Sequence, residues 1–382
     1  MNNILGGAIS SIYTDQFNLL MKINDKKNID IDFLEEIIEK FKYYSANYLN
    51  VIRLVTPKQP QFKWVSGESE RLSLMPIRHS DIWSIRQKIE ALHWTAQEVD
   101  LTKDRADWKN MKEHEKNFVK MQLAFFSRVD IDVLENINTN FVEEVDCLEA
   151  QMAYTSQAAQ ECTHAESYAL QISAVLNGAE EAETLNAVRH FPIIEHMRNW
   201  VMKWTDKKLP IGERLVAWAF IEGVMFQGPF CALQSLRERN LLPGITQYNL
   251  FISRDEAIHT LYSCLLISTY LVNQPDVNRV AKIFTEGMEL VDELITESLP
   301  VSALGISDTL MKEYVRHQAN CVLVEMGYKI LYNYKNPFPF MDKMLLNEVA
   351  KTNFFEFRPS QYQSITNSEA SLLAIDDSEV DF

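Results

Sequence analysis

The chain has 382 residues, of which 47% are hydrophobic, and its formal net charge at pH 7 is −16. An acidic surface repels phosphate backbones, which argues against a nucleic-acid-binding protein. Five scattered cysteines without a Cys-x-x-Cys pair argue against a thiolate zinc site and against a secreted disulfide scaffold. The N-terminal residues lack a basic region followed by an apolar stretch, so we expect no signal peptide and a cytoplasmic protein.

Only 11 glycines are present, and long stretches lack both Gly and Pro, which is typical of long helices. We expect residues 1–70 to form a partly helical N-terminal extension of unknown role. Residues 71–345 are expected to form one helical domain, and residues 346–382 a polar, acidic tail that docks on a partner. The helices predicted in chain order cover 79–98, 111–140, 144–176, 192–205, 211–238, 245–272, 276–298 and 307–331.

One predicted helix contains a segment, 215–234, that is apolar for about the ~20 residues needed to span a bilayer. A carboxylate, Glu222, lies near its middle, and a carboxylate at membrane depth is energetically costly. Since the sequence offers no second span, we expect the central helix of a soluble bundle rather than a membrane protein.

The motif Glu-x-x-His occurs three times, at Glu90/His93, Glu161/His164 and Glu256/His259. Residues i and i+3 share a helix face, so each pair could ligate one metal ion. A four-helix metal site also needs a carboxylate from a preceding helix for each pair. Glu222 precedes Glu256 by a suitable distance, whereas no carboxylate precedes Glu90 in this way. We therefore expect Glu90/His93 to be an ordinary surface pair.

Two acids, Asp130 and Asp132, precede Glu161 by a similar distance. Asp130 shares its helical stripe with apolar residues such as Leu123 and Phe126, so we expect it to point inward, and Asp132 to face water. The result is a repeat of one carboxylate followed by Glu-x-x-His. This arrangement is typical of ferritin-like di-iron and di-manganese proteins. Two divalent ions would offset the four buried carboxylates, and oxygen ligands with one imidazole per ion suit iron or manganese.

Several short motifs support a more specific interpretation: HWTAQEVD at 93–100, LAFFSRVD at 123–130, ECTHAESY at 161–168, IEGVMFQGPF at 221–230, ISRDEAIH at 252–259 and KTNFFEF at 351–357. From about Ile77 to Tyr362 the sequence resembles the small, radical-generating subunit of class I ribonucleotide reductases. The resemblance implies an all-α, ferritin-like helical bundle with a dinuclear metal site. It implies the same six ligands as the spacing does: Asp130, Glu161, His164, Glu222, Glu256 and His259.

The resemblance also assigns roles to residues around the metals. Tyr168 lies one turn beyond His164 and faces the site by helical geometry, and it resembles the tyrosine that carries the radical. Radical transfer is assigned to Trp94, Asp255 and the tail residue Tyr362. A shield around the radical is assigned to Phe226, Phe230 and Ile252. Pro229 removes a backbone donor and clashes with the carbonyl of Met225, so we expect a kink or bulge in the Glu222 helix.

The function implied by the resemblance is that of ribonucleoside-diphosphate reductase. The metals, expected to be two iron ions with manganese as the alternative, would activate O2 and oxidise Tyr168. The radical would then pass to a separate large subunit, docked by the C-terminal tail, where ribonucleotides are reduced. The small subunit is expected to be a homodimer. A ferritin-like iron store or a di-iron oxygenase would share the six ligands but would need neither Trp94, Asp255 and Tyr362 nor a docking tail.

Overall fold

The computed structural model describes residues 61–64, 68, 71–188 and 190–341. The predicted tail 346–382, with Tyr362, and most of the predicted extension 1–70 lie outside these residues. The predicted three-part division of the chain therefore stays a prediction.

Within the described residues the regular secondary structure is helical, apart from one antiparallel bridge between Phe62 and Leu271. The α-helices are α3 (Ser80–Ala91), α4 (Thr102–Asn110), α5 (Glu113–Asn136), α6 (Val142–Glu144), α7 (Leu148–Val175), α8 (Gly178–Val188), α9 (Pro192–Thr205), α10 (Ile211–Phe220), α11 (Gln227–Glu238), α12 (Pro243–Leu265), α13 (Val277–Glu293) and α14 (Asp308–Glu325). Four π-helical turns extend or interrupt them: η3 (Ile137–Phe141), η4 (Ile221–Met225), η5 (Leu266–Tyr270) and η6 (Leu294–Ser298). Two 3₁₀ turns, η2 (Ala96–Glu98) and η7 (Val301–Leu304), complete the set.

The predicted helices are present, with differences at their ends. The range 192–205 matches α9 at both ends. The range 79–98 is wrong as a single helix, because α3 ends at Ala91 and the chain makes a separate turn, η2. The segments that form α4 and α8 were not predicted as helices.

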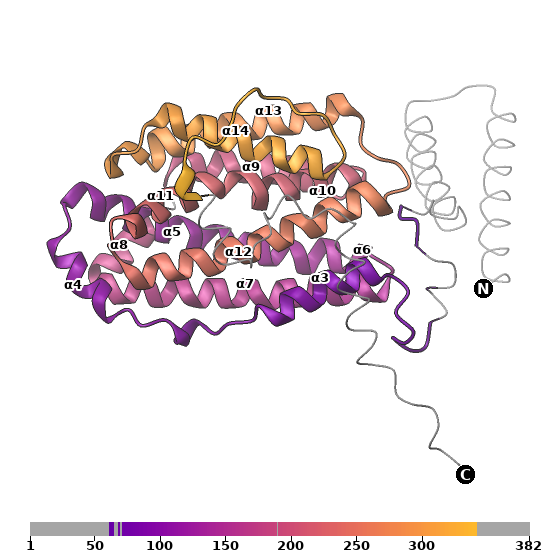
Figure 1. Cartoon of the computed structure of the whole chain (residues 1–382), viewed down its shortest axis with the longest axis horizontal. Coiled ribbons are helices and arrows are strands. Elements are labelled where there is room, and N and C mark those ends of the chain that lie inside the picture. Colours follow the sequence, from indigo (N-terminus) through magenta and orange to yellow (C-terminus); the bar gives the residue numbers. More distant parts are fainter. Residues whose placement is uncertain (1–60, 65–67, 69–70, 189, 342–382) are drawn as a thin grey trace, which may run out of the picture. The chain divides into compact units, whose positions relative to one another are not determined.

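The helices that carry the predicted ligands pack directly against one another (Figure 1). Helix α5 lies along α7, and α12 packs on α7, on α10 and on the turn η4. The helices α13 and α14 lie on the α10 side of this group, and α3 lies on the α7 side. The four ligand-bearing segments thus form the inside of the bundle.

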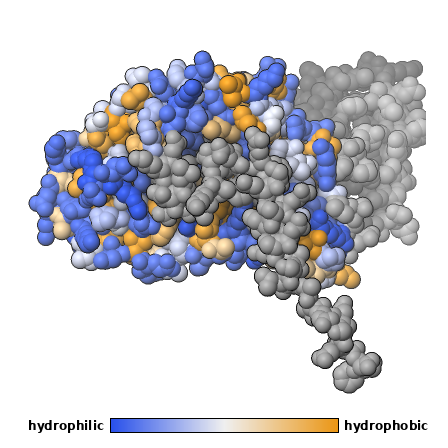
Figure 2. Space-filling view, viewed as in Figure 1, coloured by the Kyte–Doolittle hydropathy of each residue, from blue (hydrophilic) through white to orange (hydrophobic). Residues whose placement is uncertain are grey.

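The long apolar helix is buried within this bundle. The segment Ile211–Glu238, made of α10, η4 and α11, is long and apolar enough to cross a membrane, but 94% of its most apolar window is buried inside the protein. Hydrophilic residues predominate on the coloured surface in Figure 2. This burial supports the interpretation of the segment as the central helix of a bundle.

The start of α12 is fixed by a residue from another helix. The carboxylate of Asp104 on α4 accepts from the backbone N–H of Gly244 at 2.9 Å and of Ile245 at 2.8 Å. These N–H groups lie in the first turn of α12, where they have no acceptor within the helix, and Pro243 occupies the first position. Since α12 carries Glu256 and His259, this cap helps to fix the position of both predicted ligands along the axis of the bundle.

Candidate metal centre

All six predicted ligands lie together in the interior. Asp130 comes from α5, Glu161 and His164 from α7, Glu222 from η4, and Glu256 with His259 from α12. Each side chain is buried. Their donor atoms form two overlapping groups, each within 4.8 Å: Asp130, Glu161 and His164, and Glu161, Glu222, Glu256 and His259. The six residues predicted from their spacing therefore converge in space.

The two glutamates of the Glu-x-x-His motifs lie between the two imidazoles. The Nδ1 atom of His164 is 3.1 Å from Glu161 Oε2 and 3.2 Å from Glu256 Oε1. The Nδ1 atom of His259 is 3.1 Å from Glu161 Oε1 and 3.4 Å from Glu256 Oε2. Glu161 and Glu256 thus occupy bridging positions, and Asp130 and Glu222 occupy the two ends.

Several oxygen and nitrogen atoms that could bind a metal at the centre have no assigned hydrogen-bond partner. These atoms are Asp130 Oδ2, Glu161 Oε1, Glu222 Oε2, both carboxylate oxygens of Glu256, and His259 Nδ1. Unpaired charges in a dry interior are strongly destabilising. Converging carboxylate and imidazole groups of this kind fit divalent metal ions, which would neutralise the carboxylates.

The electrostatics of the centre without metal agree with this fit. Burial raises the pKa of Asp130 and of Glu222 well above the ordinary carboxyl value, and the neighbouring glutamates act in the same direction. Burial by itself lowers the pKa of His164 and His259, but the surrounding carboxylates outweigh it and raise both well above the usual value. The protein alone therefore holds protons where two cations would otherwise lie.

A hydrogen-bonded chain leads outward from His164. Its Nε2 atom is 3.2 Å from Asp255 Oδ2, and the same oxygen accepts from Trp94 Nε1 at 2.7 Å. All three side chains are buried. Arg254 lies 3.4 Å from Asp255 and donates to the Leu92 carbonyl. The structure thus brings together Trp94, Asp255 and His164, the described part of the predicted transfer route.

Two glutamines beside the ligands were missed by the sequence analysis. Gln157 Nε2 donates to Glu222 Oε1 at 2.7 Å, and Gln160 Oε1 lies 2.8 Å from His259 Nε2. Both glutamines are buried on α7. The spacing of Gln157, four residues before Glu161, puts both on one helix face and could have identified it. Gln160 precedes His164 by the same four residues, but its contact is with His259 on α12, which spacing along α7 does not reveal.

Tyr168 is buried on α7 beside an aromatic cluster. Its ring stacks on Phe126, with centroids 5.4 Å apart and planes 9° from parallel. Phe126 in turn contacts Phe226 at 5.5 Å and Phe230 at 5.0 Å. The predicted shield residues Phe226, Phe230 and Ile252 are all buried, but Phe126 is the ring that covers Tyr168 directly. Burial raises the pKa of Tyr168 well above the phenol value, and Asp130 adds to this effect.

The bulge predicted from Pro229 is present. Glu222 lies in the π-helical turn η4, which ends at Met225, the residue whose carbonyl a regular helix would press against Pro229. The Pro229 carbonyl accepts from Gln122 Nε2 at 2.7 Å. Close packing holds this turn, since an added Cβ at Gly223 would lie 2.6 Å from Thr260 Cγ2.

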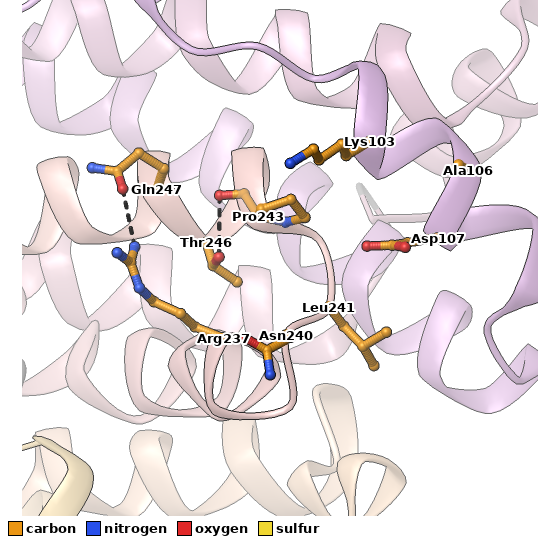
Figure 3. Close-up of a pocket in the computed structure, with 9 residues that line it drawn as sticks. All are labelled: Lys103, Ala106, Asp107, Arg237, Asn240, Leu241, Pro243, Thr246 and Gln247. Atoms are coloured by element: carbon orange, nitrogen blue, oxygen red, sulfur yellow. Dashed lines mark hydrogen bonds between the residues drawn. The ribbon is translucent and has the colours of Figure 1, made fainter.

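The remaining features lie away from the metal centre. Glu90 and His93 are exposed, which confirms them as a surface pair. A surface pocket of about 520 Å³ between α4 and the α11–α12 connection contains none of the predicted site residues (Figure 3). Its lining comprises Lys103, Ala106, Asp107, Arg237, Asn240, Leu241, Pro243, Thr246 and Gln247.

Comparisons with known proteins agree with this site. The family model for the small chain of ribonucleotide reductase matches residues 71–337. The chain is 42% identical over 308 residues to the ribonucleoside-diphosphate reductase small chain of African swine fever virus, covering 79% of this chain and 94% of that protein. It is 39% identical over 311 residues to ribonucleoside-diphosphate reductase subunit M2 of Rattus norvegicus, covering 80% of this chain and 79% of that protein.

Solved structures give the same answer for the fold. The ribonucleotide reductase Rnr4 homodimer from Saccharomyces cerevisiae has a TM-score of 0.68 at 27% identity, covering 77% of this chain and 90% of that one. The ribonucleotide reductase R2 subunit from Clostridium botulinum has a TM-score of 0.67 at 18% identity, covering 75% and 96%. The predicted ferritin-like, all-α fold is confirmed, and the alternative of an iron store or oxygenase is not favoured. The chain belongs to the family of ribonucleotide reductase small chains.

Proposed function

We propose that the six ligands hold two metal ions, with Asp130 and His164 on one side, Glu222 and His259 on the other, and Glu161 and Glu256 between them. The unpartnered donor atoms at the centre support this assignment. We propose iron, with manganese as the alternative, because carboxylate and imidazole ligands suit both. When bound, the metals supply the activation of O2 and the oxidising power of the site.

Tyr168 is proposed to lose one electron and its phenol proton and to remain as a radical. Its stacking on Phe126 and its burial exclude the water and small reductants that would quench it. Phe226 and Phe230 pack against Phe126 and close this side of the bundle, and the buried Ile252 is proposed to complete the shield.

Trp94, Asp255 and His164 are proposed to carry the oxidising equivalent outward. Asp255 accepts from Trp94 and faces His164, so one carboxylate links the ligand to the indole. The next group would be Tyr362, in a C-terminal tail that docks on a large subunit where ribonucleotides are reduced. This last step rests on the sequence resemblance, since Tyr362 lies outside the described residues.

We further propose a cytoplasmic homodimer. The relative from Saccharomyces cerevisiae is a homodimer. All five cysteines are free, which suits a reducing compartment.

The observation that carries the proposal is the convergence of six ligands beside Tyr168 and the Trp94–Asp255 pair. The test is electron paramagnetic resonance of protein loaded with Fe(II) without oxygen and then exposed to air. We expect an organic radical signal that disappears in Tyr168→Phe. The matched control is Tyr154→Phe, another buried tyrosine on α7, whose hydroxyl has no partner.

The control should keep the radical signal. Persistence of the signal in Tyr168→Phe would contradict the assignment of the radical to Tyr168. Absence of any radical with iron, followed by its appearance with Mn(II), would replace iron by manganese.

A further inference from the structure

The two imidazoles of the centre have chemically different outer partners. His164 Nε2 faces a carboxylate, Asp255, at 3.2 Å, whereas His259 Nε2 faces a neutral amide, Gln160, at 2.8 Å. All four side chains are buried. The outer partner of a histidine ligand fixes its tautomer and tunes its basicity, and a carboxylate makes the imidazole a stronger donor to metal.

The amide of Gln160 is committed to His259. Its Oε1 atom accepts the Nε2–H of His259, which leaves Nδ1 free to face Glu161 and Glu256. Its Nε2 atom has no hydrogen-bond partner, so within the described residues the amide of Gln160 bonds only to the imidazole of His259. A buried amide with an unpaired donor costs stability, which points to a role in holding the ligand.

The inner ligands of the two halves are closely matched. Each half has one imidazole and one terminal carboxylate, Asp130 or Glu222, and Glu161 and Glu256 lie near both imidazoles. The difference between the halves therefore lies mainly in the outer contacts. Glu222 also accepts from Gln157 at 2.7 Å, and this hydrogen bond competes with a metal for the oxygen lone pairs.

We propose that Gln160 is the positioning residue of His259 and that its neutral amide makes the Glu222–His259 half the weaker of two metal sites. The half with Asp130 and His164 fills first, and the other half fills second. This inference rests on the two-metal centre proposed above. It adds an order of loading and assigns that order to one residue.

The experiment is a titration of the metal-free full-length chain with Mn(II) in the absence of oxygen. Free Mn(II) is followed by its six-line electron paramagnetic resonance signal. We expect two binding steps of different affinity in the unmodified protein. Gln160→Leu should weaken the second step by about tenfold to a hundredfold, the usual effect of losing an outer partner, and leave the first unchanged.

Two further variants make the test specific. Gln160→Glu restores an acceptor with a negative charge, so it should tighten the second step beyond that of the unmodified protein. Asp255→Asn removes the carboxylate behind His164 and should weaken the first step instead. If Gln160 only stabilised the fold, Gln160→Glu would not tighten the second binding step while Asp255→Asn weakens the first.

The matched control is Gln151→Leu, on the same helix α7 but bonded to the Val145 carbonyl at 2.9 Å. It should leave both steps unchanged. The inference is overturned if Gln160→Leu alters neither step or both equally, or if Gln160→Glu fails to tighten the second step. An unmodified protein that binds fewer than two Mn(II) per chain would instead overturn the two-metal centre itself.

Discussion

The hydrogen bond between Trp94 and Asp255 offers a quantitative test of how the ligand His164 is held. The substitution Trp94→Phe keeps an aromatic ring against His164 and Phe251, whose ring centroids lie 6.1 Å and 5.3 Å from that of Trp94. It removes the indole N–H that lies 2.7 Å from Asp255 Oδ2. Because Asp255 is fully buried, water cannot replace the lost donor.

A hydrogen bond to a charged group contributes about 1.5–3 kcal/mol, so its loss should lower the free energy of unfolding by this amount. The smaller ring also loses packing, and this second loss must be subtracted. Trp218→Phe measures it, because Trp218 is equally buried and its indole N–H has no hydrogen-bond partner. The difference between the two variants isolates the hydrogen bond to Asp255.

The assay is denaturant unfolding of the metal-free protein, followed by radical and reductase measurements after iron loading. We expect Trp94→Phe to be about 1.5–3 kcal/mol less stable than Trp218→Phe. It should still form the Tyr168 radical but lose turnover with a large subunit. Equal stability of the two variants would refute the energetic reasoning, and full turnover in Trp94→Phe would refute the proposed transfer route.

Other predictions concern the supports of the ligand helices. Gly223→Ala places a Cβ 2.6 Å from Thr260 Cγ2 and should lower the stability measured in a thermal melt by about 1–3 kcal/mol. Adding Thr260→Ser should recover part of this stability, and an unchanged melt of Gly223→Ala would contradict the close packing of η4. Asp104→Ala removes the two-bond cap of α12 and should cost about 1–2 kcal/mol in denaturant unfolding, more than Asp107→Ala, which removes one bond to Leu242. Burial opposes ionisation of Glu149, but Arg71 and the Arg78 backbone N–H outweigh it and hold its pKa at about 2. Stability from this depressed carboxyl is present above its unfolded value of 4.5 and lost as pH falls toward 2, so Glu149→Gln should flatten the acid limb of a stability–pH curve, and an unchanged limb would contradict this.

The proposed metal ligands could be predicted from the sequence because their spacing is periodic. Glu161/His164 and Glu256/His259 repeat the same helical offset, and Glu222 is conspicuous as a charge inside an apolar helix. The choice of Asp130 followed from its apolar neighbours, and its burial agrees with that choice. Charged residues on an apolar stripe are rare enough to be informative in a single sequence.

The surroundings of the ligands were less predictable, for physical reasons. A neutral amide such as Gln160 is common on helices and acquires meaning only when a partner from α12 lies opposite. The turn that places Trp94 beside Asp255 follows from the end of α3 at Ala91, and no Gly or Pro marks that end. Phe126 looked like an ordinary core residue, because nothing in the sequence indicates that its ring lies flat on Tyr168.

Helix α7 explains why the predicted ligands and the residues that support them occur together. Gln157, Glu161, His164 and Tyr168 follow one another at offsets of four, three and four residues, so one face of a single helix carries them all. A rotation of α7 would therefore displace two ligands, the contact to Glu222 and the proposed radical site at once. The packing of α5, α3 and α12 against α7 prevents such a rotation. The geometry of the metal centre and the distance from it to Tyr168 are thus set by the same helix, which couples metal binding to the position of the residue proposed to be oxidised.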